Sequence, residues 1–583
     1  MDLKYTWALT DIYGTEKAWE EDYSKAENLI SFESYKGKLG EKSQFKACME
    51  SLKAVSRVIE KLSVYAYMKF DEDTSSAKAG ALLSRVEMLS VKLSTETAYI
   101  VPELTALDDK VLKDYIADEN LKDYDYSLKC ILKDKAHVLS ETEEKILTLA
   151  SEPLSCFRDI FKKIDNADLP LGTFTHKGKK YELSHGLYSV YLQSPDRELR
   201  RKAFKSYYKS YLSLINVISA TYVGNVKKDV FYAKTKKYDS ALDKALSGED
   251  VSVKVYDNLI KAVHKNLPTL HRFVREKKKA LGLKKMHMYD MYVPVVEGAD
   301  LQLEFDDAYD LVVEGLGVLG KDYQDLLRKA KQERWIDVYE KKGKRSGAYS
   351  IGVYDTHPYV LLNYQKTTHD VFTIAHEMGH SLHTYFSNKT QPYEKADYKI
   401  FVAEVASTVN EVLLLRHLLK NATDVKLKKY LLSYLMQMIR TTLFRQTQFA
   451  EFEQFSHATY EKGEPITKEN LTDFYYELNK KYYGRSVISD EEIGYEWCRI
   501  PHFYRAFYVY KYATGIISAL AIAERILTEG ETAVKDYFKF LSSGGSDSPV
   551  ELLKLAGVDL TNKKAFDNAF KVFKDSLDEF TKL

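Results

Sequence analysis

The segment that decides the fold spans residues 371–380 and reads VFTIAHEMGH. Its apolar residues recur at steps of three and four, which predicts an amphipathic helix with one buried stripe. His376 and His380 lie four residues apart, so they share one face of that helix and can bind the same metal ion. Glu377 lies about 100° around the helix from His376, close enough to take a proton from a metal-bound water without becoming a ligand. The pattern predicts a zinc site with its own general base.

A catalytic zinc site needs a third protein ligand, and the sequence offers two candidates. His383 is nearer along the chain, but it lies about 10 Å further along the helix axis than His376. Glu404 interrupts the otherwise apolar run at residues 400–409, where a carboxylate is costly unless it is paired or bound to a metal. The turn-forming residues at 387–398 can bring this second helix back across the first. Glu404 is therefore the better candidate.

Three polar residues follow Glu404 on the same face of the predicted second helix: Ser407, Thr408 and Glu411. Side chains at such positions can hold metal-binding histidines in place by hydrogen bonds. An ordinary polar helix face would carry the same residue types. The sequence by itself leaves both interpretations open.

The two segments together resemble the oligoendopeptidase F branch of the thimet-oligopeptidase family of zinc peptidases. The resemblance rests on HEMGHSLH at residues 376–383 and FVAEVAS at residues 401–407. Further matching segments follow in the expected order along nearly the whole chain: SPDR with Arg197, Tyr289-Asp290, Gly347-Ala348-Tyr349, PHFY at residues 501–504 and SGGS at residues 543–546. The resemblance implies one Zn²⁺ per chain on His376, His380 and Glu404, with Glu377 as the catalytic base.

A tyrosine-rich stretch, PHFYRAFYVYKY at residues 501–512, offers donors for the negative charge that develops on a scissile carbonyl oxygen. The resemblance implies a catalytic role for His502 and Tyr508 and a substrate-binding role for Tyr512. The tyrosine spacing differs from the family pattern. Because the chain contains 45 tyrosines, a packed aromatic helix is an alternative interpretation of the same stretch.

Residues 336–364 change to an alternating and β-branched character, which predicts a short β-sheet next to the zinc helix. Gly347, Ala348 and Tyr349 form a glycine-bearing loop in this region and are predicted to bind substrate. The edge of such a sheet can bind an extended peptide by strand addition, through backbone hydrogen bonds that ignore side-chain identity. A hairpin that only covers the core is the alternative.

With 583 residues the chain is too long for one core, and its long helical periodicities predict a mostly α fold. We expect two helical lobes that enclose a deep substrate cleft, with the small sheet next to the zinc helix. Residues 1–190 are predicted to form an N-terminal helical lobe with a small hairpin near residues 169–183. Residues 191–583 are predicted to form the zinc-peptidase catalytic region.

The charge balance argues against nucleic acid or an anionic membrane as a partner, because 86 basic and 85 acidic residues leave a net charge of +1. The longest apolar run, at residues 515–523, is too short to span a bilayer. The four cysteines have no paired spacing, and no secretory signal is visible at the amino terminus. We therefore expect a cytoplasmic protein.

By resemblance, the expected activity is that of a zinc endopeptidase that cuts internal bonds of short to medium unstructured oligopeptides. Two other classes of function stay open. A zinc carboxypeptidase or dipeptidase-type exopeptidase on the same scaffold would need a group that binds a peptide terminus, and the sequence names none. A non-enzymatic peptide-binding protein with a structural metal would be expected to have four protein ligands rather than three.

Overall fold

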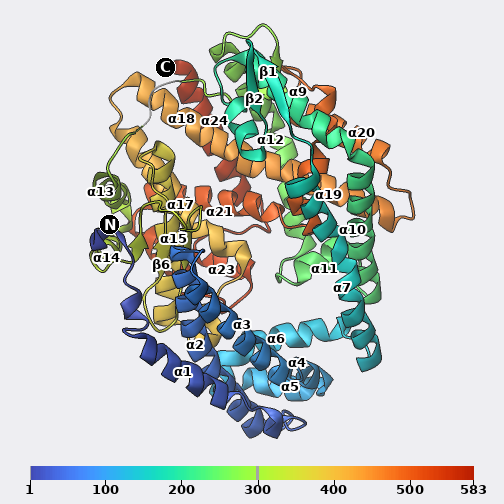
Figure 1. Cartoon of the computed structure of the whole chain (residues 1–583), viewed down its shortest axis with the longest axis vertical. Coiled ribbons are helices and arrows are strands. Elements are labelled where there is room, and N and C mark those ends of the chain that lie inside the picture. The colour runs from blue at the N-terminus through green and yellow to red at the C-terminus, as the bar shows by residue number, and fades with distance from the viewer. Residues whose placement is uncertain (1, 297–300) are drawn as a thin grey trace. The chain divides into compact units, whose positions relative to one another are not determined.

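The computed structural model describes residues 2–296 and 301–583. Within these ranges the chain is mostly α-helical with three small sheets, which confirms the predicted fold class (Figure 1). It divides into two compact units, each built from three segments. Unit 1 comprises Met1–Ala136, Asp300–Lys420 and Ile522–Val558, and unit 2 comprises His137–Ala299, Asn421–Ala521 and Asp559–Leu583. The boundary predicted after residue 190 falls within unit 2, so the compact units do not coincide with the predicted lobes.

Unit 1 holds one three-stranded sheet among its helices. The helices are α1 (Glu16–Leu29), α2 (Lys42–Glu72), α3 (Ala77–Thr97), α4 (Ile100–Ala106), α5 (Asp109–Ala117), α6 (Asp125–Asp134), α13 (Phe305–Gly315), α14 (Lys321–Gln332), α15 (Thr368–Thr390), α16 (Tyr393–Ala396), α17 (Ile400–Asn421), α22 (Glu531–Leu541) and α23 (Pro549–Leu555). The strands are β4 (Ile336–Asp337), β5 (Tyr349–Ile351) and β6 (Tyr359–Leu361), in the order β4-β6-β5. β6 is parallel to β4 and antiparallel to β5. α21 (Tyr510–Glu529) continues from unit 2 into unit 1.

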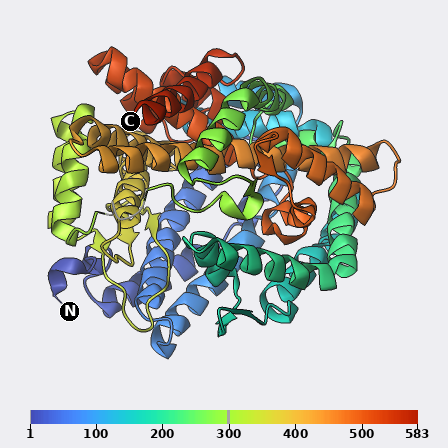
Figure 2. The ribbon, with the colours of Figure 1, turned by 90° about the horizontal axis from the view of Figure 1, so that it is seen from above.

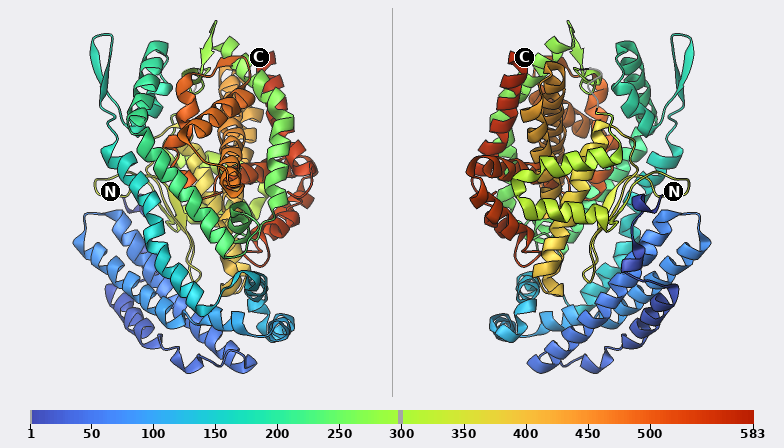
Figure 3. Two further views of the ribbon diagram at one scale, coloured as in Figure 1. Left: turned by 90° about the vertical axis from the view of Figure 1, so that its right-hand side faces the viewer. Right: turned by 90° about the vertical axis from the view of Figure 1, so that its left-hand side faces the viewer.

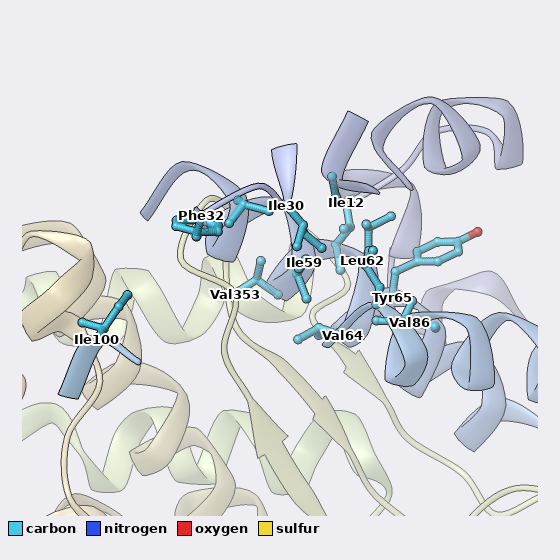
Figure 4. Packing of buried hydrophobic residues seen from close by; sticks show 14 of the residues in the cluster. Ile12, Ile30, Phe32, Ile59, Leu62, Val64, Tyr65, Val86, Ile100 and Val353 are labelled. Atoms are coloured by element: carbon cyan, nitrogen blue, oxygen red, sulfur yellow. The ribbon is translucent and has the colours of Figure 1, made fainter. Parts of the chain in front are cut away.

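The N-terminal part of unit 1 is a set of long amphipathic helices around an apolar core. α2 and α3 pack against each other, and the Ser76 side chain begins α3 by accepting a hydrogen bond from Ala79 N–H. Figure 4 shows Leu62 of α2 and Val86 of α3 in this core, together with Val353 from the loop after β5. The core therefore joins the first helices to the sheet.

The sheet of unit 1 packs against α15, as the sequence predicts. Ser350 Oγ of β5 lies 2.8 Å from Ser381 Oγ of α15. Two residues further along, a Cβ on Gly352 would lie 2.4 Å from Thr384 Cγ2 of the same helix. The position of Gly352 therefore needs a glycine, because a side chain there would separate the sheet from the helix.

Unit 2 combines long helices with a hairpin and a short parallel strand pair. Its helices are α7 (Glu141–Lys163), α8 (His185–Leu192), α9 (Arg197–Ser213), α10 (Ile215–Thr235), α11 (Ala241–Ser247), α12 (Val253–Ala280), α18 (Val425–Ile439), α19 (Arg445–Glu461), α20 (Lys468–Tyr483) and α24 (Lys564–Lys582). Its strands are β1 (Thr173–His176), β2 (Lys179–Glu182), β3 (Met286–His287) and β7 (Val487–Ile488). α7 and α10 run side by side (Figure 3), and α18 packs against α24 near the C-terminus (Figure 2).

The strands of unit 2 form two separate pairs. β1 and β2 pair antiparallel and make the hairpin expected near residues 169–183. Its turn residues Lys177 and Gly178 have φ values of 48° and 75°, the left-handed conformation that a tight two-residue hairpin turn requires. β3 and β7 pair parallel.

A buried carboxylate of unit 2 explains two of the segments that resemble the peptidase family. Asp290 is fully buried, and it accepts hydrogen bonds from Arg197 Nη2 at 3.1 Å and Arg200 Nη2 at 2.8 Å. The two guanidinium groups compensate the cost of burying its charge. Arg197 and Asp290 therefore join α9 to the segment after β3 and have a structural role.

A buried ion pair fixes the loop between β4 and β5. Lys344 Nζ donates to Asp337 Oδ1 at 2.5 Å and to the carbonyl oxygens of Tyr339 and Leu362 at 2.8 and 2.5 Å. The Lys344 and Asp337 side chains are 0% and 1% exposed. One ammonium group thus ties the loop to the carboxyl ends of β4 and β6.

Replacing Lys344 with methionine should destabilise unit 1 by about 3–5 kcal/mol, because Asp337 would keep a buried charge without its partner. Urea denaturation of purified protein measures this loss. Lys342→Met changes an exposed lysine of the same loop and serves as the control. Combining Lys344→Met with Asp337→Asn should recover part of the stability, and equal stability of all four proteins would contradict the assignment.

Among the described residues, every helix is too short or too polar to cross a lipid bilayer.

Candidate metal centre

The helix that carries the two predicted histidine ligands is α15. It begins with a capping box, in which the Thr367 side chain accepts from Asp370 N–H and the Asp370 side chain accepts from Thr367 N–H. Its apolar stripe is buried against the core of unit 1. His376 and His380 therefore lie one turn apart on the same face, as predicted, with Glu377 between them in sequence.

Three side chains bring their ligand atoms together at this face. His376 Nε2 and His380 Nε2 are 3.2 Å apart, and Glu404 Oε2 lies 3.2 and 3.4 Å from them. In the part of the chain that the structure describes, this is the one group of three or more His, Cys, Asp or Glu side chains whose ligand atoms all lie within 4.8 Å of one another. Two imidazole nitrogens and one carboxylate oxygen are a donor set that suits a zinc ion.

Glu404 reaches the histidines because α17 crosses α15 at very close range. A Cβ on Gly379 would lie 2.6 Å from Ser407 Cα and 2.7 Å from the carbonyl oxygen of Ala406. Asn410 of α17 is fully buried, and its Nδ2 donates to the carbonyl oxygen of Ala375 at 3.0 Å. The crossing thus depends on a glycine at the contact point and on one buried amide beside it.

Two further side chains of α17 form hydrogen bonds with the candidate ligands. Glu411 Oε1 lies 2.6 Å from His376 Nδ1, and because a carboxylate only accepts, Nδ1 carries the proton and leaves Nε2 free to bind a metal. Ser407 Oγ donates to Glu404 Oε2 at 3.2 Å. Of the two interpretations of this polar face, the structure favours support of the ligands.

The electrostatic environment separates the two carboxylates nearest the histidines. Burial raises the pKa of Glu404, but hydrogen bonds to His376 and His380 outweigh burial and hold that pKa well below its usual range. Glu377 is only 7% exposed, and burial raises its pKa, with the nearby histidines opposing the shift. Glu404 is therefore ionised, as a candidate metal ligand must be, whereas Glu377 is the stronger base of the two.

His383, the competing candidate for the third ligand, lies apart from this group. Its ring is stacked on Tyr398 at 3.8 Å between centroids, and Phe540 lies 5.1 Å away. Burial lowers the pKa of His383 to about 3, which keeps the ring neutral. His383 is therefore an aromatic core residue, as its displacement along the helix axis indicates.

The structure brings His502, Tyr508 and Tyr512 together within unit 2. The ring centroids of His502 and Tyr508 are 5.9 Å apart, those of His502 and Tyr512 are 6.0 Å apart, and those of the two tyrosines are 5.4 Å apart. His502 lies in a 3₁₀ turn, Pro501–Tyr504, and α21 begins only at Tyr510. The stretch is therefore not a single helix, and the catalytic role of its rings stays a prediction.

One buried acid near these rings was missed by the sequence analysis. Phe507 has a φ of 54°, an uncommon conformation for a bulky residue, and its N–H donates to Glu453 Oε1 at 2.9 Å. Glu453 is fully buried, and burial raises its pKa well above the usual range. The sequence carries no signal that singles out Glu453, because the run FAEFEQF at residues 449–455 also contains Glu451 and Gln454.

The predicted substrate-binding loop leads into the edge strand of the unit 1 sheet. Gly347 has a φ of 88°, and its carbonyl oxygen accepts from Asn363 Nδ2 at 2.7 Å. Ala348 follows, and Tyr349 begins β5 and donates from its hydroxyl group to Asp71 Oδ2 at 2.8 Å. The loop is therefore held at both ends, next to a strand that has one neighbour in the sheet.

Comparisons with known proteins cover the whole chain. The family model described as peptidase family M3 matches residues 190–572, and the model described as oligopeptidase F matches residues 103–170. Oligopeptidase PepF of Bacillus subtilis is 42% identical over 99% of this chain and 87% of its own length. A solved structure of a putative peptidase from Chlamydophila abortus has a TM-score of 0.94 at 37% identity, covering 100% of this chain and 98% of that one. Oligoendopeptidase-F from Enterococcus faecium has a TM-score of 0.74 at 35% identity, covering 97% and 99%.

Gly379→Ala should lower the metal content, because the new Cβ would push Ser407 and the rest of α17 away from the histidines. We expect a loss of about 1–3 kcal/mol in stability from the overpacked contact. Thermal unfolding and metal analysis measure the two effects.

Gly186→Ala is the matched control, since Gly186 is also helical and a Cβ there meets nothing within 4 Å. This control should gain up to about 1 kcal/mol from helix propensity. If the Gly379 variant keeps full metal content and stability, the crossing accommodates a methyl group and does not require a glycine.

Proposed function

Because the chain belongs to peptidase family M3 and matches its oligoendopeptidase F members along nearly its full length, it is a metalloendopeptidase, and we propose that its metal ion is zinc. We propose that it hydrolyses internal bonds of short to medium unstructured oligopeptides. The observation that carries the proposal is the convergence of His376, His380 and Glu404 beside the buried Glu377.

We propose that His376, His380 and Glu404 bind one Zn²⁺. Three protein ligands leave a fourth position open, which is typical of catalytic zinc, whereas structural zinc normally has four protein ligands. This argues against a peptide-binding protein with a purely structural metal. When bound, the ion would supply Lewis-acid activation of a water molecule and of the scissile carbonyl group.

Glu377 is the proposed general base. It takes a proton from the attacking water and returns it to the leaving amine. Its raised pKa supports this role, because a carboxylate with a higher pKa binds the proton more readily, while at pH values above that pKa it still starts in the base form.

We propose that His502 and Tyr508 donate hydrogen bonds to the oxyanion and that Tyr512 contacts the substrate. Their mutual ring contacts within unit 2 support a shared role.

We propose that the backbone of the peptide substrate binds along the edge of β5. Gly347 and Ala348 lead into this strand and Tyr349 begins it, so the predicted substrate-binding residues lie together at a sheet edge. Strand addition there would use backbone hydrogen bonds and would tolerate many peptide sequences. The deep cleft of the sequence prediction stays a proposal.

We also propose a division of the sequence, a location and a class of partner for this protein. The family matches to residues 103–170 and 190–572 support a division of the sequence near residue 190 into an N-terminal region and a catalytic region. The four cysteines form no disulfide, which supports the cytoplasm as the location. The near-zero net charge supports peptides, rather than nucleic acid or a membrane, as partners.

Glu377→Gln should lower kcat/KM for an end-blocked, internally quenched peptide by about 10²–10⁴-fold, because the general base is lost. The variant should keep about one zinc per chain, since Glu377 is not a proposed ligand. Chelation should silence the wild type until zinc is restored. Equal cleavage by the wild type, the variant and the chelated protein would mean that the activity belongs to another site.

A comparison of end-blocked and free peptides separates an endopeptidase from the exopeptidase alternative. An endopeptidase should cut both at similar rates, because it needs no free terminus. Cleavage restricted to peptides with a free amino or carboxyl end would replace the proposed specificity while leaving the zinc chemistry in place.

Glu411→Ala should weaken zinc binding about 10- to 100-fold, because the hydrogen bond that orients His376 is lost. Competition with a coloured chelator measures the dissociation constant. Thr408→Ala on the same helix is the matched control, and it should bind zinc as the wild type does. Unchanged affinity in the Glu411 variant would rule out the orienting role.

A further inference from the structure

We propose that a groove between α2 and α3 is a subsite that binds an apolar side chain of the peptide substrate. That side chain belongs to the peptide residue opposite Ile351 of β5. We call this subsite the α2–α3 groove. It has a volume of about 460 Å³, and its apolar lining comes from Val64 and Tyr67 of α2, Leu83, Val86 and Val91 of α3, and Ile351 of β5. The inference rests on the proposed function, in which the peptide backbone pairs with β5.

The direction of the backbone groups in the sheet follows from the contacts of its central strand. Val360 N–H of β6 donates to the carbonyl oxygen of Trp335 at 2.9 Å, on the β4 side. Leu362 N–H likewise donates to Asp337 O at 2.8 Å. Because backbone groups alternate along a strand, those of Tyr359 and Leu361 point the other way, toward β5.

This alternation decides which backbone groups of β5 are directed outward. Tyr349 is opposite Leu361 and Ile351 is opposite Tyr359, so both direct their N–H and C=O groups toward β6. Ser350 lies between them and therefore directs its N–H and C=O groups to the outer edge of the sheet. An added peptide strand would pair with Ser350.

The side chains of β5 alternate between two faces in the same way. Ser350 faces α15, because its Oγ lies 2.8 Å from Ser381 Oγ. Tyr349 faces α2, where its hydroxyl group donates to Asp71, and Ile351 faces the α2–α3 groove. The sheet edge thus lies between the helix that carries the metal ligands on one face and the groove on the other.

A paired peptide inherits this alternation, because residues opposite each other on neighbouring strands place their side chains on the same face. The peptide residue opposite Ser350 would face α15. The peptide residue opposite Ile351 would place its side chain next to Ile351 and the groove. Backbone pairing therefore tolerates many peptide sequences, and the groove adds a preference for an apolar side chain at one peptide position.

The chemistry of the groove favours an apolar occupant. Its lining is almost entirely carbon, and its outer wall includes Val91, a valine that is 66% exposed. The volume of the groove accommodates a leucine or phenylalanine side chain. In a pocket of this kind, a difference of one methylene group is worth about 10- to 200-fold in kcat/KM.

The test measures kcat/KM of the zinc-loaded full chain for end-blocked, internally quenched peptides. Each peptide carries leucine, serine or aspartate at one position at a time. The wild type should prefer leucine over serine at one position by tenfold or more. Val91→Asp should lower kcat/KM for that leucine peptide about tenfold and leave the serine peptide unchanged. Met88→Asp is the matched control, because Met88 is 62% exposed on the same helix and does not line the groove.

A second variant probes the groove without removing an apolar side chain. Glu87 is exposed and also lines the groove, so Glu87→Lys should raise kcat/KM for the peptide with aspartate at that same position. If Val91→Asp and Met88→Asp lower cleavage of all peptides equally, or if neither Val91→Asp nor Glu87→Lys changes the preference, the groove is not a subsite. A wild type that cuts no end-blocked peptide at all would instead overturn the proposed function.

Discussion

The close crossing of α15 and α17 is the contact on which the candidate metal centre depends. Two histidines one turn apart bring two ligand atoms together by helix geometry alone, but the third ligand comes from another helix. Glu404 reaches them only because Gly379 has no side chain, since a Cβ there would lie 2.6 Å from Ser407 Cα. Asn410 adds a buried hydrogen bond at the same crossing. A helix pair held apart by ordinary side chains would leave the two histidines without their carboxylate.

Three carboxylates, Glu404 and Glu377 in unit 1 and Glu453 in unit 2, differ in how their charge is compensated, and this difference decides what each can do. Glu404 is held ionised by His376 and His380 and suits a cation. Burial raises the pKa of Glu377 more than the nearby positive field of His376 and His380 lowers it, so Glu377 is a stronger base than Glu404. Glu453 accepts a hydrogen bond from the backbone N–H of Phe507, and burial raises its pKa well above the usual range.

Physical rules that act between residues close together in the chain predict features of the site correctly, and features that depend on distant residues escape them. A carboxylate inside an apolar run identified Glu404, and the three- and four-residue periodicity predicted α15 around the histidines. The same rule does not identify Glu453, because residues 449–455 also contain Glu451 and Gln454 and are not an apolar run with one carboxylate. It was not found because no neighbouring motif pointed to that helix, and its partner, the N–H of Phe507, is 54 residues away.

The sequence by itself determined the mostly α fold and the helix that carries the two candidate histidine ligands and the candidate base, and it made Glu404 the better of two candidates for the third ligand. These follow from helix periodicity and from the cost of burying charge, which depend on residues close together in the chain. Only the tertiary structure decided the crossing at Gly379, the division into two discontinuous units, and the faces of β5. Those features arise from contacts between segments far apart in sequence, and no local pattern encodes how closely two such segments approach.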